Sequence, residues 1–180
     1  MLRERDNPLP LGRLPAVNCA LSSRRIFMFR KFAILLFVML LATPVLADEV
    51  STKYISVDLP DNWKAVMAPT ENQGTTTVIF SNASGNSTVG FVTGPTGGAD
   101  AKTVADLFAS QFKAPKPPVE KSGQYTFAFT QQQTPCQSWV AAAGDIFMVT
   151  TITGDRKLGL AFIKKYVKSA EYANLLPRPN

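Results

Sequence analysis

Cys136 is the most reactive side chain outside the N-terminal region of this 180-residue chain, which has two cysteines and no histidine. The absence of histidine excludes a catalytic triad, a Cys-His pair and a His-ligated metal. A lone thiol becomes a nucleophile or redox group only beside a cation or a helix N-terminus. Strand alternation places Cys136 on one face with Ser138 and Val140, which predicts a buried structural thiol. A thiol-dependent enzyme or redox protein is the alternative.

Residues 94–103, which read GPTGGADAKT, have the setting of a phosphate-binding loop, because they follow a predicted strand and precede a predicted helix. The spacing is wrong, since the required glycines would fall at Thr96 and Ala101. Asp100 also places a negative charge where a helix N-terminus attracts phosphate. We therefore reject nucleotide binding and predict an exposed connection, which with the nearby turn at 82–86 is a candidate recognition surface. Its candidate residues are Gly94, Gly97 and Gly98.

The acidic residues occupy positions that turns and helix caps explain. Asp58 and Asp61 flank one predicted turn, Asp145 lies in a second, and Asp100 and Asp155 precede predicted helices. No stretch repeats oxygen ligands as a calcium loop does, and no pair of carboxylates is arranged for acid–base catalysis. The sequence predicts no catalytic residue, no metal site and no cofactor.

The aromatic residues Trp63, Trp139 and Tyr125 are of the types that dominate binding surfaces. In a small sheet such residues more often form the core, and we expect core positions. Trp63 and Tyr125 are kept beside Cys136 as weak binding candidates.

Residues 28–47, which read MFRKFAILLFVMLLATPVLA, contain the parts of a secretory signal peptide: a basic start, eleven consecutive apolar residues and small residues before the end. We predict cleavage between Ala47 and Asp48. The apolar run is shorter than the roughly 20 residues of a membrane span, although a membrane tether through an uncleaved leader is an alternative. Residues 1–27 precede the signal without a periodic pattern, and we interpret them as an overlong or non-native extension.

The basic charge of the chain belongs mainly to the leader. Residues 1–47 contain seven basic and two acidic residues, a net charge of +5, whereas residues 48–180 contain twelve and eleven, a net charge of +1. A nearly neutral exported part argues against binding to nucleic acid. Contact with a membrane is expected only during export.

Alternation of apolar and polar residues predicts that residues 48–180 form a single domain rich in strands. The expected strands are Lys53–Leu59, Trp63–Ala68, Thr75–Ser81, Ser87–Thr93, Gln124–Gln131, Pro135–Ala142 and Ile146–Thr153. Brief turns between the first four indicate an antiparallel meander, and Asn62 is expected to adopt the left-handed backbone that a tight reversal needs.

Two helices interrupt and end the series of strands, with Asp100 and Asp155 as their predicted N-caps. The inward residues expected in them are Val104, Leu107, Phe108 and Phe112, then Phe162, Ile163, Tyr166, Val167 and Ala170. Lys157, Lys164 and Lys168 would share a solvated face of the second helix. The order strands, helix, strands, helix predicts an α+β fold, with an antiparallel sheet of about seven strands and two helices packed on it.

Leu59 and Pro60 end the first predicted strand, and Asp61-Asn62-Trp63 open the next. This hairpin resembles the LP-x-G-W segment near the start of PsbP-like domains, a superfamily that includes small periplasmic proteins of the DcrB type. The resemblance would cover about residues 53–170, with Asn62 where glycine is usual. It implies a sandwich built on antiparallel sheet and a role in binding or assisting other proteins, and it offers no catalytic residues.

These observations predict an exported, periplasmic or secreted, non-enzymatic binding or accessory protein. Its expected partner is another exported protein or a small ligand.

Overall fold

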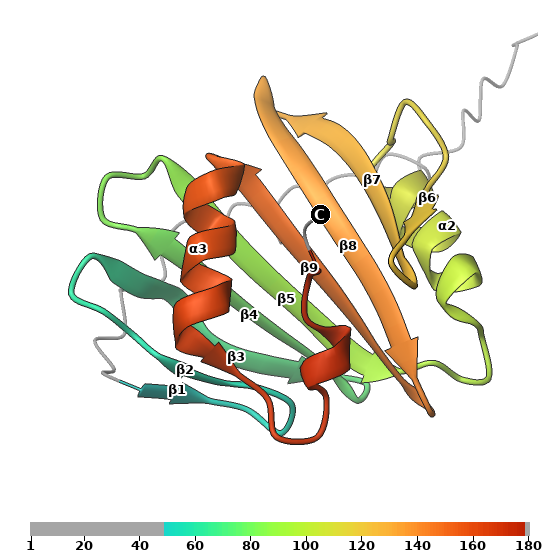
Figure 1. The fold of residues 1–180 in the computed structure, drawn as a ribbon, viewed down its shortest axis with the longest axis horizontal. Coiled ribbons are helices and arrows are strands. Elements are labelled where there is room, and N and C mark those ends of the chain that lie inside the picture. The colour runs from blue at the N-terminus through green and yellow to red at the C-terminus, as the bar shows by residue number, and fades with distance from the viewer. Residues whose placement is uncertain (1–48, 179–180) are drawn as a thin grey trace, which may run out of the picture. The chain divides into compact units, whose positions relative to one another are not determined.

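A large antiparallel sheet organises the computed structural model, which describes residues 49–178. Its strands are β3 (Trp63–Asn72), β4 (Thr75–Asn82), β5 (Ser87–Pro95), β6 (Val119–Lys121), β7 (Gln124–Gln131), β8 (Thr134–Ala143) and β9 (Ile146–Gly154). They lie side by side in the order β3-β4-β5-β9-β8-β7-β6 (Figure 1). The α+β class, the seven-stranded antiparallel sheet and the order strands, helix, strands, helix confirm the predictions.

The sheet consists of two meanders joined in the middle. β5 and β9 make this joint, with pairing that runs from Ser87 opposite Gly154 to Pro95 opposite Ile146. Within the meanders, two-residue turns with positive φ at both residues close three hairpins, because this backbone matches the twist of the paired strands. These turns are Gln73-Gly74, Ser122-Gly123 and Gln132-Gln133.

Two helices cover opposite faces of the sheet. The strands alternate their side chains between two apolar clusters, one of which includes Phe162 of α3 (Arg156–Tyr166). The other includes Ala105 and Ala109 of α2 (Ala101–Gln111). Figure 1 shows α3 across the front of β5 and β9, whereas α2 lies near β7.

Both predicted N-caps are confirmed. Asp100 Oδ1 accepts a hydrogen bond from the backbone N–H of Thr103 at 2.7 Å, and Asp155 Oδ1 accepts one from Leu158 at 3.1 Å. Each carboxylate therefore satisfies an N–H group that has no partner within its helix.

A small second sheet lies outside the predicted meander. It is formed by β1 (Glu49–Ser51), β2 (Ser56–Asp58) and β10 (Val167–Lys168), in the order β1-β2-β10. The predicted strand 53–59 is thus shorter than expected, and it pairs with β1 and β10 rather than with β3. The reason is a local turn, in which the Thr52 hydroxyl accepts hydrogen bonds from the backbone N–H groups of Tyr54 and Ile55. β6 takes its place as the seventh strand of the main sheet.

The helices are shorter than predicted, and two of the residues expected to face inward, Leu107 and Ala170, are exposed. The other expected inward residues are buried or pack against the two clusters. Leu107 is 65% exposed, because α2 packs on the sheet through the small residues Ala105 and Ala109 instead. α3 ends at Tyr166, since Val167 pairs with β2 as part of β10. Ala170 therefore lies beyond the helix and is exposed. Lys168 is likewise on β10, where its ammonium group contacts Asp58 at 2.6 Å, rather than on the expected helical stripe.

The turn before β3 does not use the expected backbone. The backbone N–H of Trp63 donates to the carbonyl of Pro60 at 2.8 Å, which closes a four-residue reversal. Asn62 is not among the described residues with positive φ. A turn of this kind accepts most residues at that position, so the comparison of Asn62 with glycine was misplaced.

The predicted extension 1–27, the signal peptide 28–47 and the cleavage point at Ala47 and Asp48 lie outside the described residues. Within residues 49–178, no helix is both long and apolar enough to cross a membrane.

Candidate functional site

The three candidate glycines do not form one exposed loop. Gly94 is buried within β5, where an added Cβ atom would lie 2.8 Å from Thr75 Oγ1, so close strand packing explains this glycine. Gly97 and Gly98 are exposed in the connection to α2, with φ of 60° and 85°.

That connection is held in place by Thr96. Its hydroxyl donates to Asp145 Oδ1 at 2.9 Å, and its backbone N–H donates to the Asp145 carbonyl at 2.8 Å. The turn at 82–86 lies at the opposite end of β5, about 26 Å away at the rise of a β-strand. The two segments that we grouped as one recognition surface are therefore separate.

Trp63 and Tyr125 lie in different parts of the molecule. Trp63 is a core residue, stacked on Phe162 with ring centroids 3.9 Å apart. Tyr125 is half-buried on the opposite face of the sheet, and its hydroxyl donates to Glu120 Oε2 at 3.3 Å. Partial burial raises the pKa of the Tyr125 hydroxyl, and the Glu120 carboxylate adds to this effect. The two aromatic residues therefore do not lie on one surface with each other or with the candidate glycines.

Cys136 is buried, as predicted, with 4% of its surface exposed. Its sulfur lies 3.3 Å from Thr153 Oγ1 and donates weakly to the carbonyl of Thr134 at 3.5 Å. Cys136 and Val140 belong to the apolar cluster that contains Ala105 and Ala109, called here the α2-side cluster. Ser138 is also buried and lies between them on the same face of β8. Strand packing accounts for all of these contacts.

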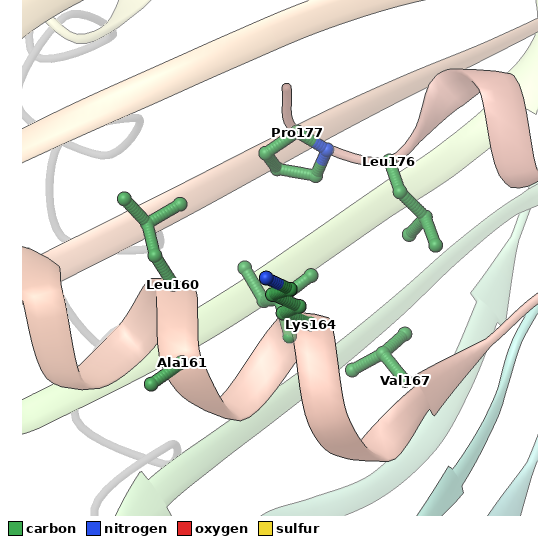
Figure 2. A pocket seen from close by; sticks show the side chains of 7 residues that line it. Leu160, Ala161, Lys164, Val167, Leu176 and Pro177 are labelled. Atoms are coloured by element: carbon green, nitrogen blue, oxygen red, sulfur yellow. The ribbon is translucent and has the colours of Figure 1, made fainter. Parts of the chain in front are cut away.

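A groove with apolar walls instead opens on the α3 face. It has a volume of about 490 Å³ and lies between α3 and the C-terminal segment 173–178, which begins with the short helix η1 (Ala173–Leu175). Figure 2 shows Leu160 of α3 on one side and Leu176 and Pro177 of the C-terminal segment on the other. Ala161, Ile163, Lys164 and Val167 complete the lining.

A smaller polar recess of about 150 Å³ adjoins the groove, because Leu160 lines both. Three cationic side chains face this recess: Lys121 from β6, Arg156 from the start of α3, and Arg178 from the C-terminal segment. The remaining lining residues are Thr126, Gln137 and Trp139. No carboxylate lines the recess within the described part of the chain.

Gln124 lines neither recess but anchors the C-terminal segment, which lines both. This residue is 2% exposed at the start of β7, and its side-chain amide donates to the carbonyl of Leu176 at 2.8 Å. Its side-chain carbonyl accepts from the backbone N–H of Arg178 at 3.0 Å. One buried amide therefore holds the C-terminal segment beside the sheet, where η1 contacts β8.

Neither Lys121 nor Arg178 stands out in the sequence, because the three cations come from three distant segments. A signal for one wall does exist. Arg156, Leu160 and Lys164 are spaced by four residues, which places them on one face of a helix. The opposite wall depends on a C-terminal segment without periodicity, which the hydrogen bonds of Gln124 and the burial of Leu175 hold beside the sheet.

Apart from Thr126, the residues that line the groove and the recess are apolar, cationic or amide-bearing. They include no cysteine, serine or carboxylate, and the described residues contain no cluster of three side chains able to hold a metal ion. Two arginines offer planar, forked donors that match carboxylate or phosphate oxygens. The adjoining groove offers apolar side chains.

Comparison with known proteins adds little to this site. No protein-family model matches the chain, and no curated protein matches it. A crystal structure from Bacteroides thetaiotaomicron is distantly similar, with a TM-score of 0.39 and 12% sequence identity. The match covers 66% of this chain and 46% of the Bacteroides chain, so the aligned region is less than half of that protein.

Proposed function

We propose that this chain is an exported, non-enzymatic protein that binds a small ligand between α3 and the C-terminal segment. The observation that carries the proposal is the pair of recesses that meet at Leu160. A groove of about 490 Å³ is within the usual size range of ligand pockets. The C-terminal segment that completes it is fixed by a buried amide, so the groove exists before any ligand arrives.

Export is part of this proposal. Residues 28–47 have the composition of a signal peptide, and the part of the chain after Ala47 is nearly neutral. N-terminal sequencing of protein recovered from the periplasm is expected to begin at Asp48. Recovery of the intact leader in a membrane fraction would favour the tethered form instead.

We also propose a relationship to PsbP-like domains. Its support is the segment Leu59–Trp63 together with the α+β order of elements. The accessory character of that superfamily fits a binding role without catalytic residues, and the partner would then be small or another exported protein.

Native mass spectrometry of the protein purified from the exported fraction tests the binding proposal directly. We expect a co-purifying small molecule, or a mass increase when a mixed library of anions, amphiphiles and neutral metabolites is added. The variant Leu160→Trp places a bulky uncharged ring where both recesses meet and should remove the adduct by blocking the space, whatever the charge of the ligand. Failure of every compound to bind, or an adduct unaffected by Leu160→Trp, would contradict the proposed site.

A further inference from the structure

We infer that the ligand is a single-chain anionic amphiphile, with its carboxylate or phosphate headgroup at Lys121, Arg156 and Arg178 and its hydrocarbon chain in the groove. This inference rests on the proposed function and names the class of ligand for the same site. It follows from the charge of one recess, the apolar character of the other and their junction at Leu160.

Among residues 49–178, the cations of the polar recess have no acidic partner within salt-bridge distance. The salt bridges found within residues 49–178 join Lys102 to Asp106 and Lys168 to Asp58, so neither involves the recess. Like charges brought together on a surface create a positive potential that attracts an anion. Two arginine forks and an ammonium group are the donors that proteins use for carboxylate and phosphate.

Trp139 and Gln137 also line this recess, and their side chains are held in place by the protein. Trp139 is buried, with 7% of its surface exposed, and it lines the recess. The Gln137 amide is held by a hydrogen bond to the carbonyl of Phe127 at 3.0 Å. A headgroup here would rest against an aromatic ring and an oriented amide instead of bulk water.

The recess and the groove follow one another along α3, because Arg156 lines the recess, Leu160 lines both and Lys164 lines the groove. Arg156 and Lys164 are eight residues apart, about 12 Å at the helical rise of 1.5 Å per residue, which is the span of about ten extended carbons. Leu160, Val167 and Leu176 would cover such a chain, and each methylene buried there should strengthen binding about fourfold. Affinity should therefore rise with chain length and level off near about ten carbons.

Binding of decanoate to protein purified from the exported fraction, measured by calorimetry, is the first test. Decanol lacks the charge, butyrate lacks the chain, and decyltrimethylammonium reverses the charge. We expect each to bind at least about tenfold more weakly than decanoate, because a charge-assisted contact or several buried methylenes is lost. Decyl phosphate should bind at least as well as decanoate if the recess accepts either headgroup.

Charge substitutions locate the headgroup. Arg156→Gln and Arg178→Gln should each weaken decanoate binding about tenfold and leave decanol unchanged. Arg178→Gln keeps the backbone N–H that bonds Gln124, so the C-terminal segment stays in place. The matched control is Lys157→Gln, which removes the same charge from the neighbouring exposed position of α3 that lines neither recess. It should change the affinity less than twofold.

Fluorescence fixes the orientation of the chain. The protein has two tryptophans, Trp63 and Trp139, so the variant Trp63→Phe reports on Trp139 alone. 2-Bromodecanoate, with its heavy atom beside the carboxylate, should quench Trp139 strongly, and 10-bromodecanoate should quench it weakly. The reverse order would place the headgroup at the other end of the groove and overturn the inference.

Equal binding of decanol and decanoate, or no loss in both arginine variants, would also overturn it. A neutral or cationic adduct that Leu160→Trp removes would refute the anionic amphiphile while leaving the binding function intact. The absence of any adduct would refute the function itself.

Discussion

The side-chain carbonyl of Gln124 accepts a hydrogen bond from the backbone N–H of Arg178 at 3.0 Å. The same side chain donates to the carbonyl of Leu176 on the other side of Pro177. The buried amide at the start of β7 thus forms hydrogen bonds with the backbone of the last described residues, as a neighbouring strand would do. Since Leu176, Pro177 and Arg178 line the two recesses, the shape of the site depends on a residue that lies outside it.

Replacing Gln124 with leucine should therefore affect both stability and binding. The substitution leaves the carbonyl of Leu176 and the N–H of Arg178 without their partners, at a cost of about 2 kcal/mol in the free energy of unfolding. Urea unfolding measures this loss, and decanoate binding should fall by more than about tenfold as the wall of the groove loosens.

Gln131→Leu is the matched control, because Gln131 is exposed at the other end of β7. Its effect on the free energy of unfolding should stay within about 0.5 kcal/mol. Equal effects of the two substitutions would mean that the hydrogen bonds of Gln124 to Leu176 and Arg178 do not account for the loss of stability.

Cys136 should behave as a structural thiol. In the full chain carrying Cys19→Ser, an alkylating reagent at neutral pH should modify Cys136 only as fast as the protein unfolds, because the sulfur is 4% exposed. Adding urea should accelerate the reaction in step with unfolding. Rapid alkylation of the folded protein would revive the thiol-enzyme alternative. Cys136→Ser should retain decanoate binding, since Cys136 lies in the α2-side cluster and lines neither recess.

Gly159 sets the distance between α3 and the sheet. A Cβ atom added there would lie 2.6 Å from Ile152 Cγ2 and 3.1 Å from Ser87 Oγ. Alanine favours a helix by up to about 1 kcal/mol over glycine, but the clash should cost about 1–3 kcal/mol. We expect Gly159→Ala to destabilise the protein in urea unfolding.

A double-mutant cycle separates these two effects. Ile152→Ala removes the nearest atoms that the new methyl group would meet and leaves the Ser87 hydroxyl at 3.1 Å. Gly159→Ala should therefore destabilise the protein much less in that background. A loss of the same size in both backgrounds would show that the close approach to Ile152 is not the cause.

The strands were predictable because their side chains alternate between the two faces of the sheet, where the two apolar clusters lie. Predicted and observed bounds of β7 are identical, and those of β4 and β9 differ by one residue at one end. The first strand was misassigned because its alternation continues through Tyr54 and Ile55, where the Thr52 hydroxyl imposes a turn instead. β6 has three exposed residues and no apolar pattern to reveal it.

The site could not be predicted from the sequence to the same extent. Periodicity reports which residues face the core, whereas the recesses lie where α3, β6 and the C-terminal segment meet without regular pairing. Arg156, Leu160 and Lys164 carry a helical signal that points to one wall. Gln124 has no such signal in the sequence. A glutamine at the start of a strand is expected to be exposed, whereas this one is buried. Candidates chosen by chemical type, such as Trp63, were core residues.

The N-cap of α2 should give the protein a measurable dependence on acid. Hydrogen bonds from Thr103, first of all from its backbone N–H, lower the pKa of Asp100 below its ordinary value of 3.8. A carboxyl group whose pKa is lower in the folded state binds its proton more tightly in the unfolded state. The ionised cap therefore contributes stability in full above pH 3.8, and this contribution disappears as the pH falls through the lowered pKa of the folded state.

Asp100→Asn keeps a capping oxygen that does not titrate. In urea unfolding, the free-energy difference between the two proteins should be constant from pH 7 down to about pH 5 and should shift in favour of the asparagine variant at lower pH. A difference that stays constant down to about pH 2 would show that Asp100 caps the helix without a change in its proton affinity on folding.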